Sequence, residues 1–127
     1  MRRIVLDMNA GLLAEAVEQS LTRCDPDFIV YRSSNPEKTL DLCRVCHANV
    51  LVMEVMRQGV WKLSERLKIR NEVKKLGWDC KILLLVDERI DEMLAANVRQ
   101  VVKDQLVDNF IYASVSPTYL AGVIDML

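Results

Sequence analysis

The sequence predicts an α/β domain built on a doubly wound, five-stranded parallel sheet with helices on both faces. Short apolar runs alternate with longer amphipathic segments five times along the chain. Two of these runs, residues 50–53 and 82–86, are apolar throughout, as central parallel strands covered by helices on both sides require. Right-handed crossovers between five strand–helix units give this architecture. The 127 residues fit a single domain over residues 1–127, which could itself be the N-terminal part of a longer protein.

Each predicted strand is followed by a helical pattern. The strands are expected at residues 4–6, 28–31, 50–53, 82–86 and 110–112. Asn9 can cap a first helix, whose apolar face consists of Leu13, Val17 and Leu21. Asn35 with Pro36, and Ser116 with Pro117, each place a capping residue before a proline at the first helical position. These pairs predict where the second and fifth helices begin.

The third helix, expected over about residues 60–76, has an unusual pattern. Its apolar residues form two nearly opposite groups: Val60, Leu63 and Leu67, and Ile69, Val73 and Leu76. The helix therefore either breaks near Lys68 or buries both sides, which requires a partner chain or unusual packing. The remaining helices are marked by apolar residues at helical spacing: Ile90, Leu94, Val98 and Val101, then Leu120, Val123, Ile124 and Leu127.

Composition excludes several classes of function. A net charge of −1 does not favour nucleic-acid binding by the domain itself. The apolar runs are too short to span a bilayer, and Asp7 interrupts the first of them too early for a signal peptide. We therefore expect a cytoplasmic protein whose four cysteines stay reduced. The four glycines are too scattered to form a phosphate-binding loop.

Two acidic residues end strands that are expected to be neighbours. In the flavodoxin-like strand order 2-1-3-4-5, the first and third strands lie side by side, and ligands bind beyond their carboxyl ends. Asp7 ends the first strand and Glu54 ends the third. We expect both carboxylates to point into one crevice, although ordinary solvent-exposed acids at strand ends would give the same pattern.

Three segments carry a resemblance to a known family. They are residues 4–9 (Ile-Val-Leu-Asp-Met-Asn), 50–56 (Val-Leu-Val-Met-Glu-Val-Met) and 108–114 (Asp-Asn-Phe-Ile-Tyr-Ala-Ser). In order and spacing they resemble the signature segments of response-regulator receiver domains, the chemotaxis-regulator-like domains of two-component signalling. The resemblance covers essentially the whole chain and implies a role in a phosphorelay.

The residues that carry the chemistry of this family are mostly replaced. The paired acids that hold magnesium in the family correspond to Asp7 and Met8, and a thioether is a poor ligand for this hard cation. The phosphoacceptor aspartate corresponds to Glu54. The hydroxyl residue, the lysine and the aromatic switch residue correspond to Val86, Ala113 and Phe110. Since phosphoryl transfer depends on positioning and charge neutralisation, the pocket is expected to be degenerate.

The resemblance and these replacements lead to one main hypothesis. We expect an atypical receiver that is no enzyme, needs no cofactor, binds magnesium weakly or not at all, and acts independently of phosphorylation. It would take part in signal transduction or transcription regulation through protein–protein contact. A homodimer is expected, with the fourth helix, fifth strand and fifth helix as the family's usual surface, together with an output domain or partner protein. The alternative is a phospho-accepting receiver or a small magnesium-dependent phosphocarrier that uses Asp7 and Glu54.

Four basic residues recur every fourth position in the third helix: Lys62, Arg66, Arg70 and Lys74. They form either a solvated face or a contact surface for an acidic partner. Trp61 and Trp78 flank the helix and could anchor such a contact or pack into the core.

Cys43, Cys46 and His47 spell the CxxCH pattern of covalent haem attachment. The segment lies inside a predicted helix, which favours two core thiols and a histidine at a helix end. A zinc or haem protein remains a third possibility, in which Cys24 or Cys80 would supply a further zinc ligand.

Overall fold

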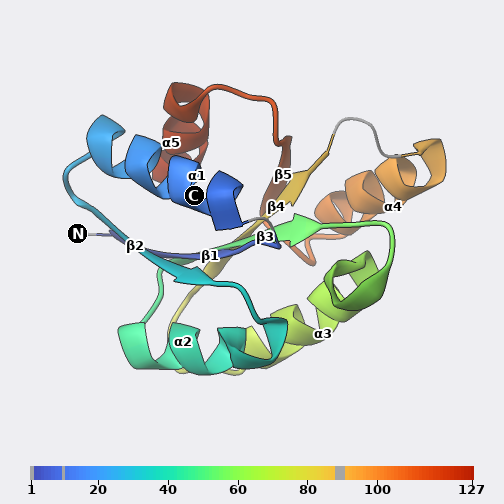
Figure 1. Cartoon of the computed structure of the whole chain (residues 1–127). Helices are drawn as coiled ribbons and strands as arrows, with labels where there is room; N and C mark the ends of the chain where they lie inside the picture. The colour runs from blue at the N-terminus through green and yellow to red at the C-terminus, as the bar shows by residue number, and fades with distance from the viewer. Residues whose placement is uncertain (1, 10, 88–90) are drawn as a thin grey trace.

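The computed structural model describes residues 2–9, 11–87 and 91–127. Five parallel strands form one sheet in the order β2-β1-β3-β4-β5, which confirms the predicted fold class (Figure 1). The strands are β1 (Arg2–Asp7), β2 (Phe28–Ser33), β3 (Val50–Val55), β4 (Lys81–Val86) and β5 (Asn109–Tyr112). The helices are α1 (Gly11–Cys24), α2 (Thr39–Cys46), α3 (Leu63–Val73), α4 (Glu92–Lys103) and α5 (Pro117–Met126), with short 3-10 helices η1 (Pro36–Lys38) and η2 (Gly59–Trp61).

The sheet separates two hydrophobic cores. Helices α1 and α5 cover one face, and α2, α3 and α4 cover the other (Figure 1). Side chains of a strand alternate between the faces, so Val52 of β3 packs towards α1 and α5 while Met53 packs towards the other three helices. Central strands β3 and β4 must be apolar on both sides for this reason, and their sequences are.

The capping residues act largely as predicted. The Asn35 side chain accepts a hydrogen bond from the Glu37 N–H at 3.0 Å, but the turn it starts is η1, and α2 follows directly. The Ser116 hydroxyl accepts from the Tyr119 N–H at 3.1 Å at the start of α5. Asn9 precedes α1, but residue 10 between them lies outside the described residues, as does Ile90 of the predicted fourth helix.

Helix α3 is shorter than predicted and does not break near Lys68. It begins at Leu63 because residues 59–61 form η2, and it ends at Val73. Leu63 and Leu67 line a groove with Val101 of α4, while Val73 is fully buried in the core below the sheet. Both apolar groups of the helix thus pack against the core of the chain itself, although Leu63 and Leu67 remain half-buried beside the groove.

Within the described residues, no helix has the length and apolar character needed to cross a bilayer.

Candidate functional site: a buried ion pair at the carboxyl end of the sheet

The carboxylate of Asp7 is buried at the end of β1. Asp7 and Arg66 both have fully buried side chains, and the Arg66 Nη1 lies 2.7 Å from the Asp7 Oδ2. The Arg66 Nη2 donates to the Asp7 Oδ1 at 3.3 Å and to the Asp7 carbonyl oxygen at 3.1 Å. The Arg66 Nε donates to the carbonyl oxygen of Glu54 at 2.7 Å. One guanidinium from α3 thus bridges the ends of β1 and β3.

A hydroxyl group completes the shell around this carboxylate. Thr39, the first residue of α2, donates from its Oγ1 to the Asp7 Oδ2 at 2.7 Å. The Ser33 hydroxyl lies 3.0 Å from the Thr39 hydroxyl. Because buried charges are costly unless they are paired and hydrogen-bonded, these contacts are what allow Asp7 to be buried. Burial lowers the pKa of the Arg66 guanidinium, and the charge of Asp7 opposes that shift.

Glu54 is separate from Asp7, so the predicted common crevice does not form. The Asp7 side chain points towards α2 and α3. Asp7 pairs with Met53, so the next residue, Glu54, points to the other face of the sheet, where it is half-buried. The Glu54 Oε1 accepts a hydrogen bond from the Asn9 N–H at 2.8 Å. The two carboxylates therefore do not face one shared cation position.

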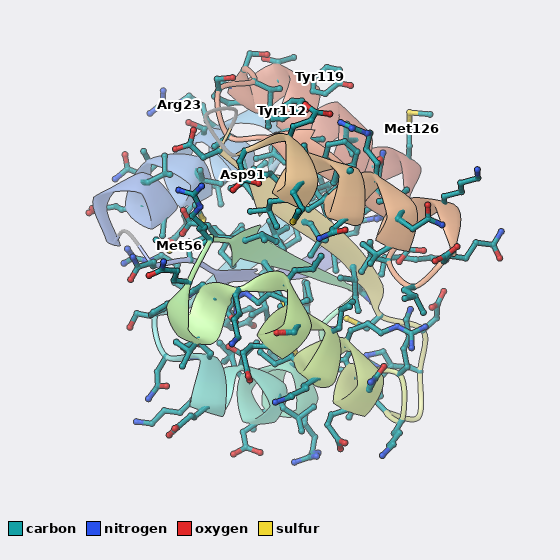
Figure 2. All side chains as sticks on the ribbon, turned by 90° about the vertical axis from the view of Figure 1, so that its right-hand side faces the viewer. Arg23, Met56, Asp91, Tyr112, Tyr119 and Met126 are labelled. Atoms are coloured by element: carbon teal, nitrogen blue, oxygen red, sulfur yellow. The ribbon has the colours of Figure 1, made fainter. Side chains whose placement is uncertain are left out.

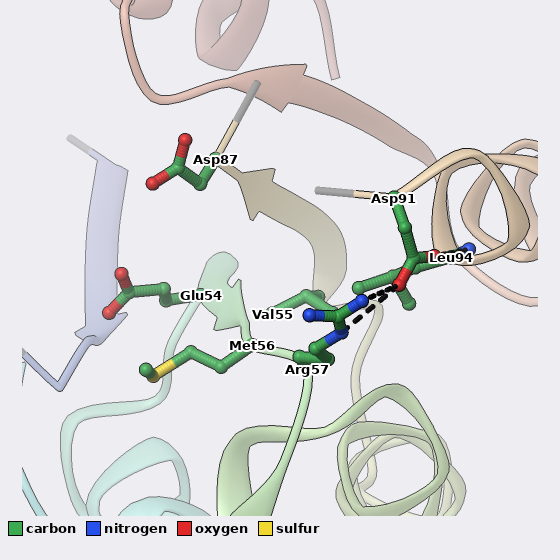
Figure 3. Close-up of a pocket in the computed structure, with 7 residues that line it drawn as sticks. All are labelled: Glu54, Val55, Met56, Arg57, Asp87, Asp91 and Leu94. Atoms are coloured by element: carbon green, nitrogen blue, oxygen red, sulfur yellow. Dashed lines mark hydrogen bonds and ion pairs between the residues drawn. The ribbon is translucent and has the colours of Figure 1, made fainter. Parts of the chain in front are cut away.

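A pocket of about 320 Å³ opens above β3 and β4 (Figure 3). Its lining consists of Glu54, Val55, Met56, Arg57, Asp87, Asp91 and Leu94. Arg57 crosses one side of the pocket and contacts the Asp91 Oδ2 through its Nε at 3.1 Å and its Nη2 at 2.8 Å (Figure 3). Glu54 and Asp87 lie on the other side, so the pocket is acidic there.

The other predicted site residues are apolar and packed. Met8 is 1% exposed and belongs to the core beneath α1 and α5. Val86 is fully buried, and its carbonyl oxygen accepts from the Ala113 N–H at 2.8 Å. Ala113 lines a small apolar hollow between α1 and α5, of about 140 Å³. Phe110 is half-buried and meets Tyr112 edge to face, with ring centroids 5.7 Å apart.

The prediction that Arg66 contributes to a basic contact surface on α3 is wrong, because its side chain is fully buried and no partner can reach it. Arg70 donates from its Nε to the Leu106 carbonyl oxygen at 2.6 Å, and Lys74 donates to the Cys80 carbonyl oxygen at 3.1 Å. Lys62 is exposed and precedes the helix. Three of the four regularly spaced basic residues, Arg66, Arg70 and Lys74, therefore make contacts within the chain.

Both tryptophans are used inside the chain. The Trp61 ring lies beside Arg66, with the guanidinium carbon 6.0 Å from the ring centroid. The Trp78 Nε1 donates to the Ala48 carbonyl oxygen at 2.7 Å, and its ring stacks on His47 at 3.7 Å. Neither residue has the free, exposed ring that an anchor for a partner needs.

The CxxCH segment serves packing. Cys43 and Cys46 are buried on α2, and His47 ends the helix in a left-handed conformation with φ of 57°. In the part of the chain that the structure describes, no three His, Cys, Asp or Glu side chains form a group that could hold a metal ion. Haem attachment would require exposing two core thiols, so the geometry argues against this third possibility.

Thiol reactivity provides a direct test of this packing. Burial raises the pKa of Cys43 and Cys46, and that of Cys80 to about 12, so their reactive thiolates are scarce at neutral pH. We expect Ellman's reagent at pH 7.5 to modify Cys24, which is exposed, and to reach the other three thiols only on unfolding in denaturant. Rapid release of more than one equivalent of chromophore from the folded protein would contradict this assignment.

Comparison with solved structures identifies the architecture. A LuxR-family DNA-binding response regulator from Staphylococcus aureus superposes with a TM-score of 0.78 at 16% identity, covering 99% of this chain and 98% of that one. The signal receiver domain of a DNA-binding response regulator (merR) from Colwellia psychrerythraea 34H gives 0.77 at 17% identity, with 99% and 97% covered. This chain has the receiver-domain fold. A CheY-like receiver domain protein from Methanospirillum hungatei JF-1 also matches, with a TM-score of 0.76, 13% identity, and 99% and 92% covered.

No family model and no curated protein matches the sequence. The chain shares the backbone fold of these structures. The role of its buried ion pair is therefore inferred from the residues of this chain. Arg66 and Thr39 were not singled out as partners of Asp7 from the sequence. One signal for Arg66 was available, because it lies at helical spacing between Leu63 and Val73, on the apolar side of the helix.

Proposed function

We propose that this receiver-fold chain is an atypical receiver that signals through protein–protein contact and is not switched by aspartyl phosphate. The observation that carries the proposal is the Arg66–Asp7 pair. Both carboxylate oxygens of Asp7 are engaged by Arg66 and Thr39, so a magnesium ion would have to displace a buried guanidinium. Such a displacement would leave Arg66 as an uncompensated buried charge, which is strongly unfavourable.

The residues at positions 86 and 113, which correspond to the hydroxyl and lysine of receiver domains, support the same proposal. A phosphoryl group on Glu54 would meet no hydroxyl at Val86 and no ammonium at Ala113, so these two positions offer nothing to neutralise its charge. Glu54 itself carries a single negative charge, compared with nearly two for a phosphate, and is at best a weak permanent mimic. Binding to another protein surface is therefore a better-supported role for this chain than phosphoryl transfer.

The face formed by α4, β5 and α5 is the surface we propose for homodimerisation. On these elements, Met93 of α4 exposes 76% of its surface, and Tyr119 and Met126 of α5 expose 57% and 89%. Tyr112, Tyr119 and Met126 lie on the same side of the molecule (Figure 2). A shallow groove lined by Phe110, Tyr112 and Tyr119 adds aromatic surface, which is typical of protein interfaces. Exposed apolar side chains gathered in this way mark interaction sites more often than scattered ones do.

The proposed setting is a two-component transcription regulator in the cytoplasm. The structures from S. aureus and C. psychrerythraea are of DNA-binding response regulators, which supports an output domain or partner of that kind. The four free cysteines are compatible with a reducing compartment.

Phosphorylation tests the proposal directly. After incubation with acetyl phosphate and magnesium, we expect intact-mass spectrometry to detect no phosphate adduct, and calorimetry to detect no saturable magnesium binding at millimolar concentrations. A receiver domain with a complete acidic site, treated in parallel, is the positive control. A base-labile adduct on Glu54 would overturn the proposal and favour the alternative of a phospho-accepting receiver or magnesium-dependent phosphocarrier.

A further inference from the structure

We propose that the Arg57–Asp91 ion pair is a clasp that holds the start of α4, and with it the α4–β5–α5 face, in one position without a phosphoryl group. The inference rests on the proposed function, since it describes how that interaction surface is regulated. The clasp joins two segments that are far apart in sequence: the connection between β3 and α3, and the N-terminus of α4.

Asp91 makes two different interactions with its two oxygens. The Oδ1 accepts a hydrogen bond from the Leu94 N–H at 2.8 Å and so caps α4. The Oδ2 accepts from the Nε and Nη2 of Arg57 at 3.1 and 2.8 Å. The hydrogen bond from the Leu94 N–H and the pairing with Arg57 both lower the pKa of this carboxyl group. A shift of the first turn of α4 away from β3 would break the contact with Arg57.

The other end of the clasp is firmly supported. Arg57 follows Val55 and Met56 at the end of β3, and the Met56 N–H donates to the Trp61 carbonyl oxygen at 2.9 Å. The Trp61 ring in turn lies beside the buried Arg66. The connection that carries Arg57 therefore contacts the buried Arg66–Asp7 pair through Trp61. This pair and the start of α4 are thus linked through a short series of contacts.

The clasp acts on the exposed first turn of α4, where Glu92 also pairs with Arg99 of the same helix at 2.9 Å. Residues 91–93 are exposed, and Ala95 is the first buried residue of the helix. Met93, one of the exposed apolar residues of the proposed dimer surface, lies in this first turn. Holding the turn in place therefore fixes where Met93 is presented, and this reduces the ordering cost of association.

Matched variants test the clasp. Arg57→Gln removes the ion pair, and Asp91→Asn removes it while keeping a good N-cap side chain. Lys62→Gln removes one positive charge from the same connection without touching the clasp. We expect amide hydrogen exchange at residues 94–97 to accelerate roughly two- to fivefold in Arg57→Gln and Asp91→Asn, the range for an exposed ion pair, with no change in Lys62→Gln. The double variant Arg57→Gln/Asp91→Asn should exchange no faster than either single variant.

Two readouts separate the clasp from the dimer. Unchanged exchange in Arg57→Gln, or the same change in Lys62→Gln, would overturn the clasp whatever the oligomeric state. Sedimentation of the unaltered chain tests the homodimer separately, and a monomer at all concentrations would overturn that part of the proposed function alone. If the chain dimerises, Arg57→Gln should weaken the dimer. Faster exchange without weaker dimerisation would refute the regulatory role of the clasp.

Discussion

Replacing Arg66 with methionine is expected to lower the free energy of unfolding by about 3–5 kcal/mol at neutral pH, the cost of leaving a buried charge without its partner. Methionine fills much of the volume of arginine but, among the described residues, leaves the Asp7 carboxylate with the Thr39 hydroxyl as its side-chain donor. The Glu54 carbonyl oxygen also loses the hydrogen bond from the Arg66 Nε. Urea unfolding followed by circular dichroism measures the change.

The double variant Asp7→Leu/Arg66→Met is the matched control. It removes both charges together, and apolar replacements of buried ion pairs are often neutral or stabilising, so it should recover most of the lost stability. A loss of less than about 1 kcal/mol in Arg66→Met, the value typical of an exposed pair, would mean that the ion pair is solvated. The Arg66–Asp7 pair would then be open to water and could not keep magnesium away from Asp7.

Replacing Tyr119 with glutamate is expected to weaken the proposed homodimer by about thirtyfold or more, which corresponds to the roughly 2 kcal/mol that defines an interface hot spot. Tyr119 is 57% exposed on α5 and lines the groove beside β5, so a carboxylate there would be buried against aromatic surface on association. Analytical ultracentrifugation over a concentration series gives the dissociation constant.

Val45→Glu provides the control for this variant. Val45 is 84% exposed on α2, on the opposite face of the sheet from α5, and it exchanges an exposed apolar residue for the same acid. It should leave dimerisation unchanged. Equal weakening by both variants would point to a general charge effect, and no effect of Tyr119→Glu would place the interface elsewhere.

The identity of the site residues followed from the sequence only in part. The positions of Asp7 and Glu54 at the ends of neighbouring strands were predictable, because strand ends can be read from where apolar runs stop. Their separation was not, since it depends on which face of the sheet each side chain occupies. The resemblance to receiver domains pointed to Val86 and Ala113 as positions without a hydroxyl or an ammonium group, and both residues are packed against apolar neighbours.

The basic residues of α3 show the limit of reasoning from spacing. Arg66 and Lys62 have the same charge sign and the same four-residue periodicity, yet one is fully buried and the other exposed. Periodicity assigns residues to the faces of a helix, but which face is buried depends on what packs around it. Here α3 packs beside α2, and the Asp7 carboxylate lies on its buried side.

The order of elements, the parallel sheet and its two cores were determined by the sequence alone, because hydrophobic periodicity and capping residues are local properties of the chain. The partners of Asp7, the Arg57–Asp91 clasp and the burial of Arg66 on α3 were decided only by the tertiary structure. Each of these joins residues from different helices and strands, and a single sequence carries no direct signal of which distant side chains will meet.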